Sequence, residues 1–412
     1  MSTAFPILVA LAGQSVFGGG HVFYAEEYDW ERIFDLAQEQ EVLPLAWYAV
    51  KNAGKCPPML AASVERTVRS TVVSYYVRSE SMIRLLQEAE QAGIPNIRIL
   101  KGFAIADCYA VPEARISGDI DILIDKKYES AMLRFLEEHR FVMMKREIGR
   151  HHSVCVHPNL GTLEVHVALF SREDKTVWLQ NVDLKHLEHD AGTEITSPMG
   201  TFRTLDLTNH MIFLFLHFLN HFVNTGASLK MIFDVGVFYA VHSQEIDSRR
   251  LHDILRQCRG EKLFGSILRI CSNFCTVSYP QEDVSMADDA LSELLLKDIQ
   301  TGGVMGGREI VKRQVEKRQN ARIKLKRRTG RATYFAYQVR HYLIQAKSYF
   351  APSHNELLQV YPELEQNRIC YLRACLLFTR RKIRDYKGRR GLFRTYAIEH
   401  GRTEILKKMR LI

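Results

Sequence analysis

Residues 115–125 read RISGDIDILID, a β-branched apolar run with two aspartates at alternate positions. Successive side chains of a strand point to opposite faces of a sheet, so Asp119 and Asp121 share one face and lie roughly 6–7 Å apart. The three isoleucines at the intervening positions take the other face, as in a strand that packs on a core. The stretch therefore predicts a strand that carries two carboxylates on one side.

Two neighbouring carboxylates on a partly buried surface repel each other and lose hydration, and a divalent cation offsets both costs. Oxygen ligands of this kind suit Mg²⁺ or Mn²⁺, which keep coordination positions open for phosphate oxygens. Gly118, directly before the pair, lets a phosphate group approach the backbone. By itself, the pattern also fits a solvated strand end or the metal site of a sugar-nucleotide glycosyltransferase.

A third carboxylate is available at Glu164, in the apolar stretch TLEVHVAL (162–169). Its neighbours Leu163 and Val165 would face the core, and His166 would share the face of Glu164. If this strand lies beside the aspartate strand, the three acids converge. That arrangement suits metal-assisted phosphoryl or nucleotidyl transfer.

The surrounding pattern predicts an α+β fold in three parts. Residues 1–95 read as helical, residues 96–205 as a small core with a mixed sheet, and residues 206–412 as helical again. Strands are expected at 94–102, 119–125, 141–148, 151–158 and 161–169, with a helix at 127–140 between the second and third of them.

Charge is divided unevenly along the chain. Residues 301–412 carry 27 Lys and Arg against 8 Asp and Glu, a net +19, whereas residues 1–300 have a net −10. We expect long basic helices at 312–331 and 380–394. Such segments are usually solvated, but they also suit contact with nucleic acid, another polyanion or the acidic part of the chain.

No stretch reaches the roughly 18 uninterrupted apolar residues that a membrane span needs. The most apolar one, 211–223, contains His217 and His221 and is expected to be a buried helix. The start of the chain has no basic, apolar leader, and none of the eight cysteines forms a CxxC pair. These features predict a cytoplasmic protein with reduced thiols.

The combined pattern LKG…RISGDIDILI…HH…LEVH resembles the nucleotidyltransferase superfamily that includes DNA polymerase beta and aminoglycoside nucleotidyltransferases. More narrowly, it resembles a bacterial family usually called uncharacterised nucleotidyltransferases. The specific match covers residues 96–170, with a looser likeness along most of the chain. The residues that carry it are Lys101, Gly102, Arg115, Asp119, Asp121, His151, His152, Glu164, His166, His217 and Asp234.

The resemblance implies a nucleotidyltransferase core in which Asp119, Asp121 and Glu164 hold Mg²⁺ or Mn²⁺. It implies a metal-binding, nucleotide-binding transferase that moves an NMP from an NTP such as ATP to an unknown acceptor. The remaining roles are triphosphate binding by Lys101, Gly102, Arg115 and Gly118, and substrate contact or support of the site by His152, His166, His217 and Asp234.

One position departs from the superfamily. The phosphate loop usually has Gly-Gly or Gly-Ser, and here Gly102 is followed by Phe103, so a hydroxyl contact to phosphate is lost. Lys101 could supply a compensating charge. Three other residues also allow a purely structural interpretation. His217 and His221 have zinc-ligand spacing but also suit a helix core, and Asp234 could pair with Lys230 one helical turn away.

Two other functions stay open at this level. A glycosyltransferase would place its D-x-D after several parallel strands, and only one strand and helix precede it here. A catalytically silent RNA- or polyanion-binding protein would use the basic residues of 301–412.

Overall fold

The computed structural model describes residues 4–19, 28–53, 55–115, 117–144, 152–170, 179, 182–224, 226–302, 404–405 and 408–409. The basic segments 312–331 and 380–394 lie outside these residues, as does His151.

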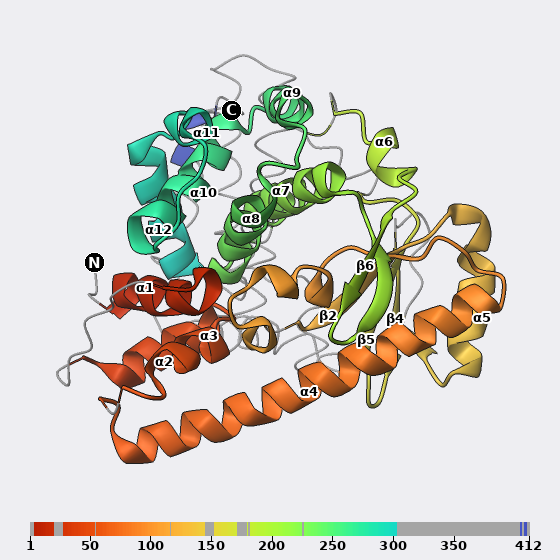
Figure 1. Ribbon diagram of the computed structural model, residues 1–412, viewed down its shortest axis with the longest axis horizontal. Coiled ribbons are helices and arrows are strands. Elements are labelled where there is room, and N and C mark those ends of the chain that lie inside the picture. The colour runs from red at the N-terminus through yellow and green to blue at the C-terminus, as the bar shows by residue number, and fades with distance from the viewer. Residues whose placement is uncertain are drawn as a thin grey trace, which may run out of the picture.

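The first part of the chain is helical, as predicted. Its helices are α1 (Ala4–Phe17), α2 (Trp30–Glu39), α3 (Leu43–Val50) and α4 (Pro58–Gln91). Between α2 and α3 the chain turns at Glu41, whose φ of 60° cannot continue a helix. Helix α4 ends shortly before Gly93, which takes a φ of 88° that suits glycine. In Figure 1, α4 runs from the N-terminal helices to the sheet.

The centre is a seven-stranded mixed sheet in the order β3-β4-β5-β2-β1-β7-β6. Its strands are β1 (Arg98–Ile99), β2 (Asp119–Leu123), β3 (Val142–Met143), β4 (His152–His157), β5 (Gly161–His166), β6 (Thr193–Ser197) and β7 (Gly200–Thr204). Strand β2 pairs parallel with β5, and β1 pairs parallel with β7, whereas all other neighbours are antiparallel. The α+β class and the mixed sheet are thus confirmed.

The hairpin β6–β7 was not predicted. Its strands are mostly polar, with Ile195 and Phe202 as their only large apolar residues. A half-exposed hairpin at a sheet edge lacks the alternation that marks a strand in sequence. Its inner strand adds parallel to β1, which is itself only two residues long.

The remaining elements cover the sheet and complete the helical part. Helix α5 (Glu129–Glu138) follows β2 through the 3₁₀ turn η4 (Lys126–Tyr128), and the turns η1 (Gly102–Ala104), η2 (Ala106–Cys108) and η3 (Pro112–Ala114) connect β1 to β2. The later helices are α6 (Lys185–Glu188), α7 (Leu207–Asn224), α8 (Leu229–His242), α9 (Ser248–Cys258), α10 (Glu261–Phe274), α11 (Gln281–Ser285) and α12 (Asp289–Gly302). The predicted helical region is confirmed as far as residue 302.

Strand β2 separates two apolar clusters. Ile120, Ile122 and Ile124 are buried in one, together with residues of α4 and α5. Leu123, on the same face as the two aspartates, belongs to the other, which contains α1, α7, α8 and α10. The aspartates therefore face the helical part of the molecule. No helix in the described ranges is long and apolar enough to cross a bilayer.

His210 joins α7 to the end of β1, just before Lys101. Its Nε2 lies 2.8 Å from the carbonyl of Leu100, and its Nδ1 lies 3.3 Å from Oγ1 of Thr204. Burial lowers the pKa of His210 to about 4, below the usual value near 6.5. The neutral ring is therefore the form that the folded state accommodates.

The pKa of His210 predicts a specific loss of stability in acid. Because the pKa of His210 is lower in the folded state than in the unfolded state, its contribution to the free energy of unfolding is complete above pH 6.5. This contribution declines by up to about 3 kcal/mol as the pH falls toward 4. Urea unfolding at several pH values should show this decline in the wild type and a flatter profile in His210→Gln. The control is His186→Gln, at an exposed histidine, in which the free energy of unfolding should change with pH as it does in the wild type. If His210→Gln also kept the wild-type pH dependence, His210 would not be its source.

Candidate active site

Three carboxylates converge where β2 and β5 lie side by side. The two strands are parallel, and Asp121 stands opposite Glu164 in their register. One oxygen from each of Asp119, Asp121 and Glu164 lies within 4.8 Å of the others. The side chain of Asp121 is 3% exposed, that of Glu164 23% and that of Asp119 42%, so the cluster opens to solvent at Asp119.

The ammonium group of Lys101 lies against these carboxylates. Its Nζ is 3.1 Å from Oδ2 of Asp121 and 3.8 Å from Oδ2 of Asp119. Burial alone would lower the pKa of Lys101, but the charges of Asp121 and Asp119 outweigh it and raise this pKa. For Asp121, the opposing charge of Lys101 and a hydrogen bond from His166 outweigh burial and lower the pKa. The acid pair thus requires positive charge beside it.

Two histidines contact the carboxylates from neighbouring strands β4 and β5. Nε2 of His166 is 3.1 Å from Oδ1 of Asp121 and 3.5 Å from Oε2 of Glu164. Burial opposes protonation of His166, but hydrogen bonds to both carboxylates raise its pKa to about 9. Nε2 of His152 lies 3.7 Å from the same Glu164 oxygen. Both histidines expected to support the site therefore adjoin it.

His217 is the third histidine at the site. Its Nε2 lies 3.5 Å from Nζ of Lys101, and its ring lies 4.4 Å from that of His221, centroid to centroid. Burial and the charge of Lys101 hold the pKa of His217 well below its ordinary value. A neutral imidazole can accept a hydrogen bond from the Lys101 ammonium group.

The loop before β2 is held by a residue that sequence reasoning missed. Arg78, on α4, donates to the carbonyls of Leu160 at 2.8 Å, Ser117 at 3.1 Å and Gly118 at 2.9 Å. It thereby links the starts of β2 and β5, the strands that carry the acids. On an exposed helix with several other arginines, nothing in the local sequence singles it out.

Arg78→Met should lower the free energy of unfolding by about 2 kcal/mol, because charge-assisted hydrogen bonds to three backbone carbonyls are lost. Urea unfolding would measure this. Arg84→Met, on the same helix, is the matched control: Arg84 forms an exposed ion pair with Glu80, and we expect a change below about 0.5 kcal/mol. Equal effects of the two variants would contradict the role of Arg78.

The structure explains Phe103 in the phosphate loop. Gly102 takes a φ of 74°, and a Cβ there would come within 3.0 Å of Oγ of Ser117. Phe103 is buried and packs edge-on against Phe202, with 5.4 Å between ring centroids. Ser117, which was not among the expected site residues, places a hydroxyl beside Gly102 instead. That hydroxyl donates to the carbonyl of Asp119 at 2.6 Å.

Arg115 and Asp234 form a buried ion pair. Nε and Nη2 of Arg115 lie 2.9 and 2.8 Å from the two oxygens of Asp234, and the hydroxyl of Tyr109 donates to Oδ1 at 2.5 Å. The charge and hydrogen bonds of Arg115 outweigh burial and lower the pKa of Asp234. The expected pairing of Asp234 with Lys230 is wrong, because Lys230 reaches across to Glu41 at 3.2 Å.

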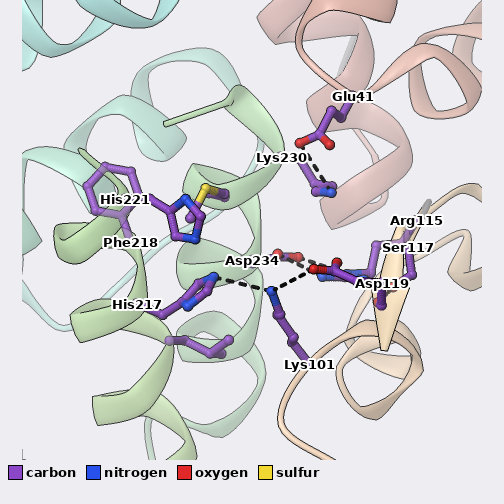
Figure 2. Close-up of a pocket in the computed structure, with 12 residues that line it drawn as sticks. Glu41, Lys101, Arg115, Ser117, Asp119, His217, Phe218, His221, Lys230 and Asp234 are labelled. Carbon is purple, nitrogen blue, oxygen red and sulfur yellow. Dashed lines mark hydrogen bonds and ion pairs between the residues drawn. The ribbon is translucent and has the colours of Figure 1, made fainter. Parts of the chain in front are cut away.

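A cavity of about 160 Å³ lies beside the acids, between the start of β2 and helices α7 and α8. Figure 2 shows Lys101 between Asp119 and His217, with the Lys230–Glu41 pair at the far end. Its lining residues are Glu41, Lys101, Arg115, Ser117, Asp119, Leu214, His217, Phe218, His221, Lys230, Met231 and Asp234. Arg115 lines this cavity, and its Nη1 is buried with no hydrogen-bond partner in the described part of the chain.

The donor set of Asp119, Asp121 and Glu164 fits a hard divalent cation. All three ligands are carboxylates, and the spacing of their oxygens lets them share an ion. Next to them, three cationic side chains line the cavity. The arrangement can therefore hold a divalent cation and, beside it, phosphate groups.

Comparison with known proteins adds one finding. The model of a family described as "Uncharacterised nucleotidyltransferase" matches residues 26–276, more than half of the chain. Searches of curated proteins and of solved structures find no match. The matched residues include α2–α10 and so the whole sheet, all three acids and both helices that line the cavity.

Proposed function

Because the chain belongs to the uncharacterised nucleotidyltransferase family, we propose that it moves an NMP group from an NTP to an acceptor in a reaction that needs a divalent metal ion. The observation that carries this proposal is the convergence of Asp119, Asp121 and Glu164 beside a cavity lined by cationic side chains. Acids on two neighbouring strands, next to a cavity in which Lys101, Arg115 and Lys230 stand beside their carboxylate partners, supply the groups that transfer of a charged phosphoryl group requires.

We assign Asp119, Asp121 and Glu164 as the ligands of Mg²⁺ or Mn²⁺. A bound ion of this kind supplies positive charge to the triphosphate and lowers the pKa of an attacking hydroxyl. Asp119 is the most exposed of the three and lines the cavity, so its carboxylate is the one nearest to a substrate bound there. Glu164, beside the two histidines, either holds metal or accepts the proton of the acceptor.

The cavity is proposed to hold the triphosphate. Lys101 lies between the carboxylates and the cavity, so its ammonium group can contact a phosphate oxygen without leaving the acids. Arg115 lines the cavity, and Lys230 lies at the opposite end. Gly118, exposed directly before Asp119, has open space where a side chain would stand, so a phosphate can approach its backbone closely, whereas Gly102 is buried against Ser117.

In the proposed step, an acceptor oxygen forms a bond to the α-phosphorus of the NTP, and the bond between that phosphorus and the bridging oxygen of the β-phosphate breaks. The acceptor loses its proton to Glu164 or to water, and pyrophosphate leaves. His217, neutral and 3.5 Å from Nζ of Lys101, orients the ammonium group. The high density of basic residues in 301–412 favours an anionic acceptor.

The test is release of pyrophosphate from each of the four NTPs, ATP first, with Mg²⁺ or Mn²⁺. Release should require the metal, cease on chelation with EDTA and return when Mg²⁺ is restored in excess. Radiolabel from an α-labelled NTP should appear on an acceptor. Metal-dependent turnover of a UDP-sugar in place of an NTP would overturn the proposal in favour of glycosyl transfer, and binding of RNA without NTP turnover would favour a silent binding protein.

A further inference from the structure

A second group of potential metal ligands lies beside the cluster of Asp119, Asp121 and Glu164. It consists of His152, His166 and the same Glu164. His152 on β4 stands directly opposite His166 on β5 in their antiparallel register. Glu164 lies two residues before His166 and therefore on the same face. One strand thus supplies a histidine and the other a histidine and a carboxylate.

The distances suit a small ion. Oε2 of Glu164 lies 3.7 Å from Nε2 of His152 and 3.5 Å from Nε2 of His166. The three ligand atoms all lie within 4.8 Å of one another. A tetrahedral ion with bonds of about 2.0–2.1 Å places its ligand atoms about 3.4 Å apart, so only small side-chain rotations separate this arrangement from a coordination shell.

The donor chemistry differs from that of the acid cluster. Two imidazole nitrogens and one carboxylate oxygen favour Zn²⁺ and its transition-metal neighbours, whereas Mg²⁺ prefers oxygen alone. The side chains of His152, Glu164 and His166 are 16, 23 and 9% exposed, so the position is shielded but reachable from solvent. Three protein ligands leave a fourth position open.

We propose that His152, Glu164 and His166 form a binding site for a transition-metal ion of the zinc class, which shares Glu164 with the cluster of Asp119 and Asp121. Neither histidine is a ligand of the proposed magnesium site, although His166 contacts Asp121, so the inference does not depend on nucleotidyl transfer. An ion bound to the two histidines would also bind Glu164 and so hold its carboxylate in position.

The experiment loads the chelator-treated full-length protein with Co²⁺ and follows its visible ligand-field bands, which nitrogen ligands in a tetrahedral site intensify. We expect bands that Zn²⁺ abolishes and excess Mg²⁺ does not. His152→Asn should weaken Co²⁺ binding at least about tenfold, because one of three ligands is lost. His186→Asn, an exposed histidine on α6, is the matched control and should bind as the wild type does.

Asp119→Asn distinguishes the two sites. Asp119 belongs to the acid cluster but not to the histidine site, so its replacement should leave the Co²⁺ bands in place. Bands that survive in His152→Asn, or that vanish in Asp119→Asn, would overturn the proposal, as would a lack of binding by the wild type.

X-ray absorption is measured on the zinc-loaded wild type, so its result does not depend on whether a variant folds. Scattering from two imidazole rings would support the site, and a shell of oxygen alone would overturn it. Cobalt binding at the histidines without pyrophosphate release would refute only the proposed function. NTP turnover without cobalt binding would refute only this metal site.

Discussion

Asp121→Asn is expected to abolish nucleotidyl transfer. Asp121 is the most buried of the three acids and contacts both Lys101 and His166, so its carboxylate is the centre of the proposed metal site. A bound metal ion contributes several kcal/mol to stabilising the transition state. Since about 1.4 kcal/mol corresponds to a factor of ten in rate, the loss should be at least about a hundredfold.

The measurement is the initial rate of pyrophosphate release at saturating NTP and Mg²⁺. Glu138→Gln, an exposed carboxylate on α5, removes a negative charge away from the site and should keep the wild-type rate. Circular dichroism should show the same helix content in both variants. A wild-type rate in Asp121→Asn would remove Asp121 from the mechanism and the main support for the proposed chemistry.

The sequence was most informative where a strand carries a regular pattern. Alternation alone predicted that the aspartates of β2 share one face and that Ile120 and Ile122 face a core, and both isoleucines are buried. The same reasoning for Glu164 depended on β5 lying beside β2. That neighbourhood follows from sheet topology, which alternation within a single strand does not determine.

The contacts that sequence reasoning missed join residues far apart in the chain. Arg78 reaches Leu160, Lys230 reaches Glu41, and Arg115 reaches Asp234, each across more than 80 positions. Local spacing favoured a pairing of Asp234 with Lys230 on one helix, but a guanidinium that meets both carboxylate oxygens is the stronger partner. The polar hairpin β6–β7 was missed for a different reason, because it has no apolar period to detect.

Arg115→Met is expected to give the largest loss of stability. It leaves Asp234 buried without its countercharge, and removal of one partner of a buried ion pair costs about 3–5 kcal/mol. Urea unfolding at neutral pH measures the loss. The triple variant Arg115→Met, Asp234→Leu and Tyr109→Phe removes the charge, its partner and the hydroxyl that donates to it, and should recover most of the lost stability.

The triple variant also separates the two roles of Arg115. If Arg115 only holds β2 against α8, the refolded triple variant should transfer NMP with a wild-type KM for the NTP. If the guanidinium of Arg115, which lines the cavity, contacts the triphosphate, KM should stay raised after stability has returned. A charge-assisted hydrogen bond contributes about 1.5–3 kcal/mol, so the increase should be roughly tenfold to a hundredfold. Wild-type KM together with restored stability would show that the pair is structural and that the triphosphate depends on Lys101 and Lys230 instead.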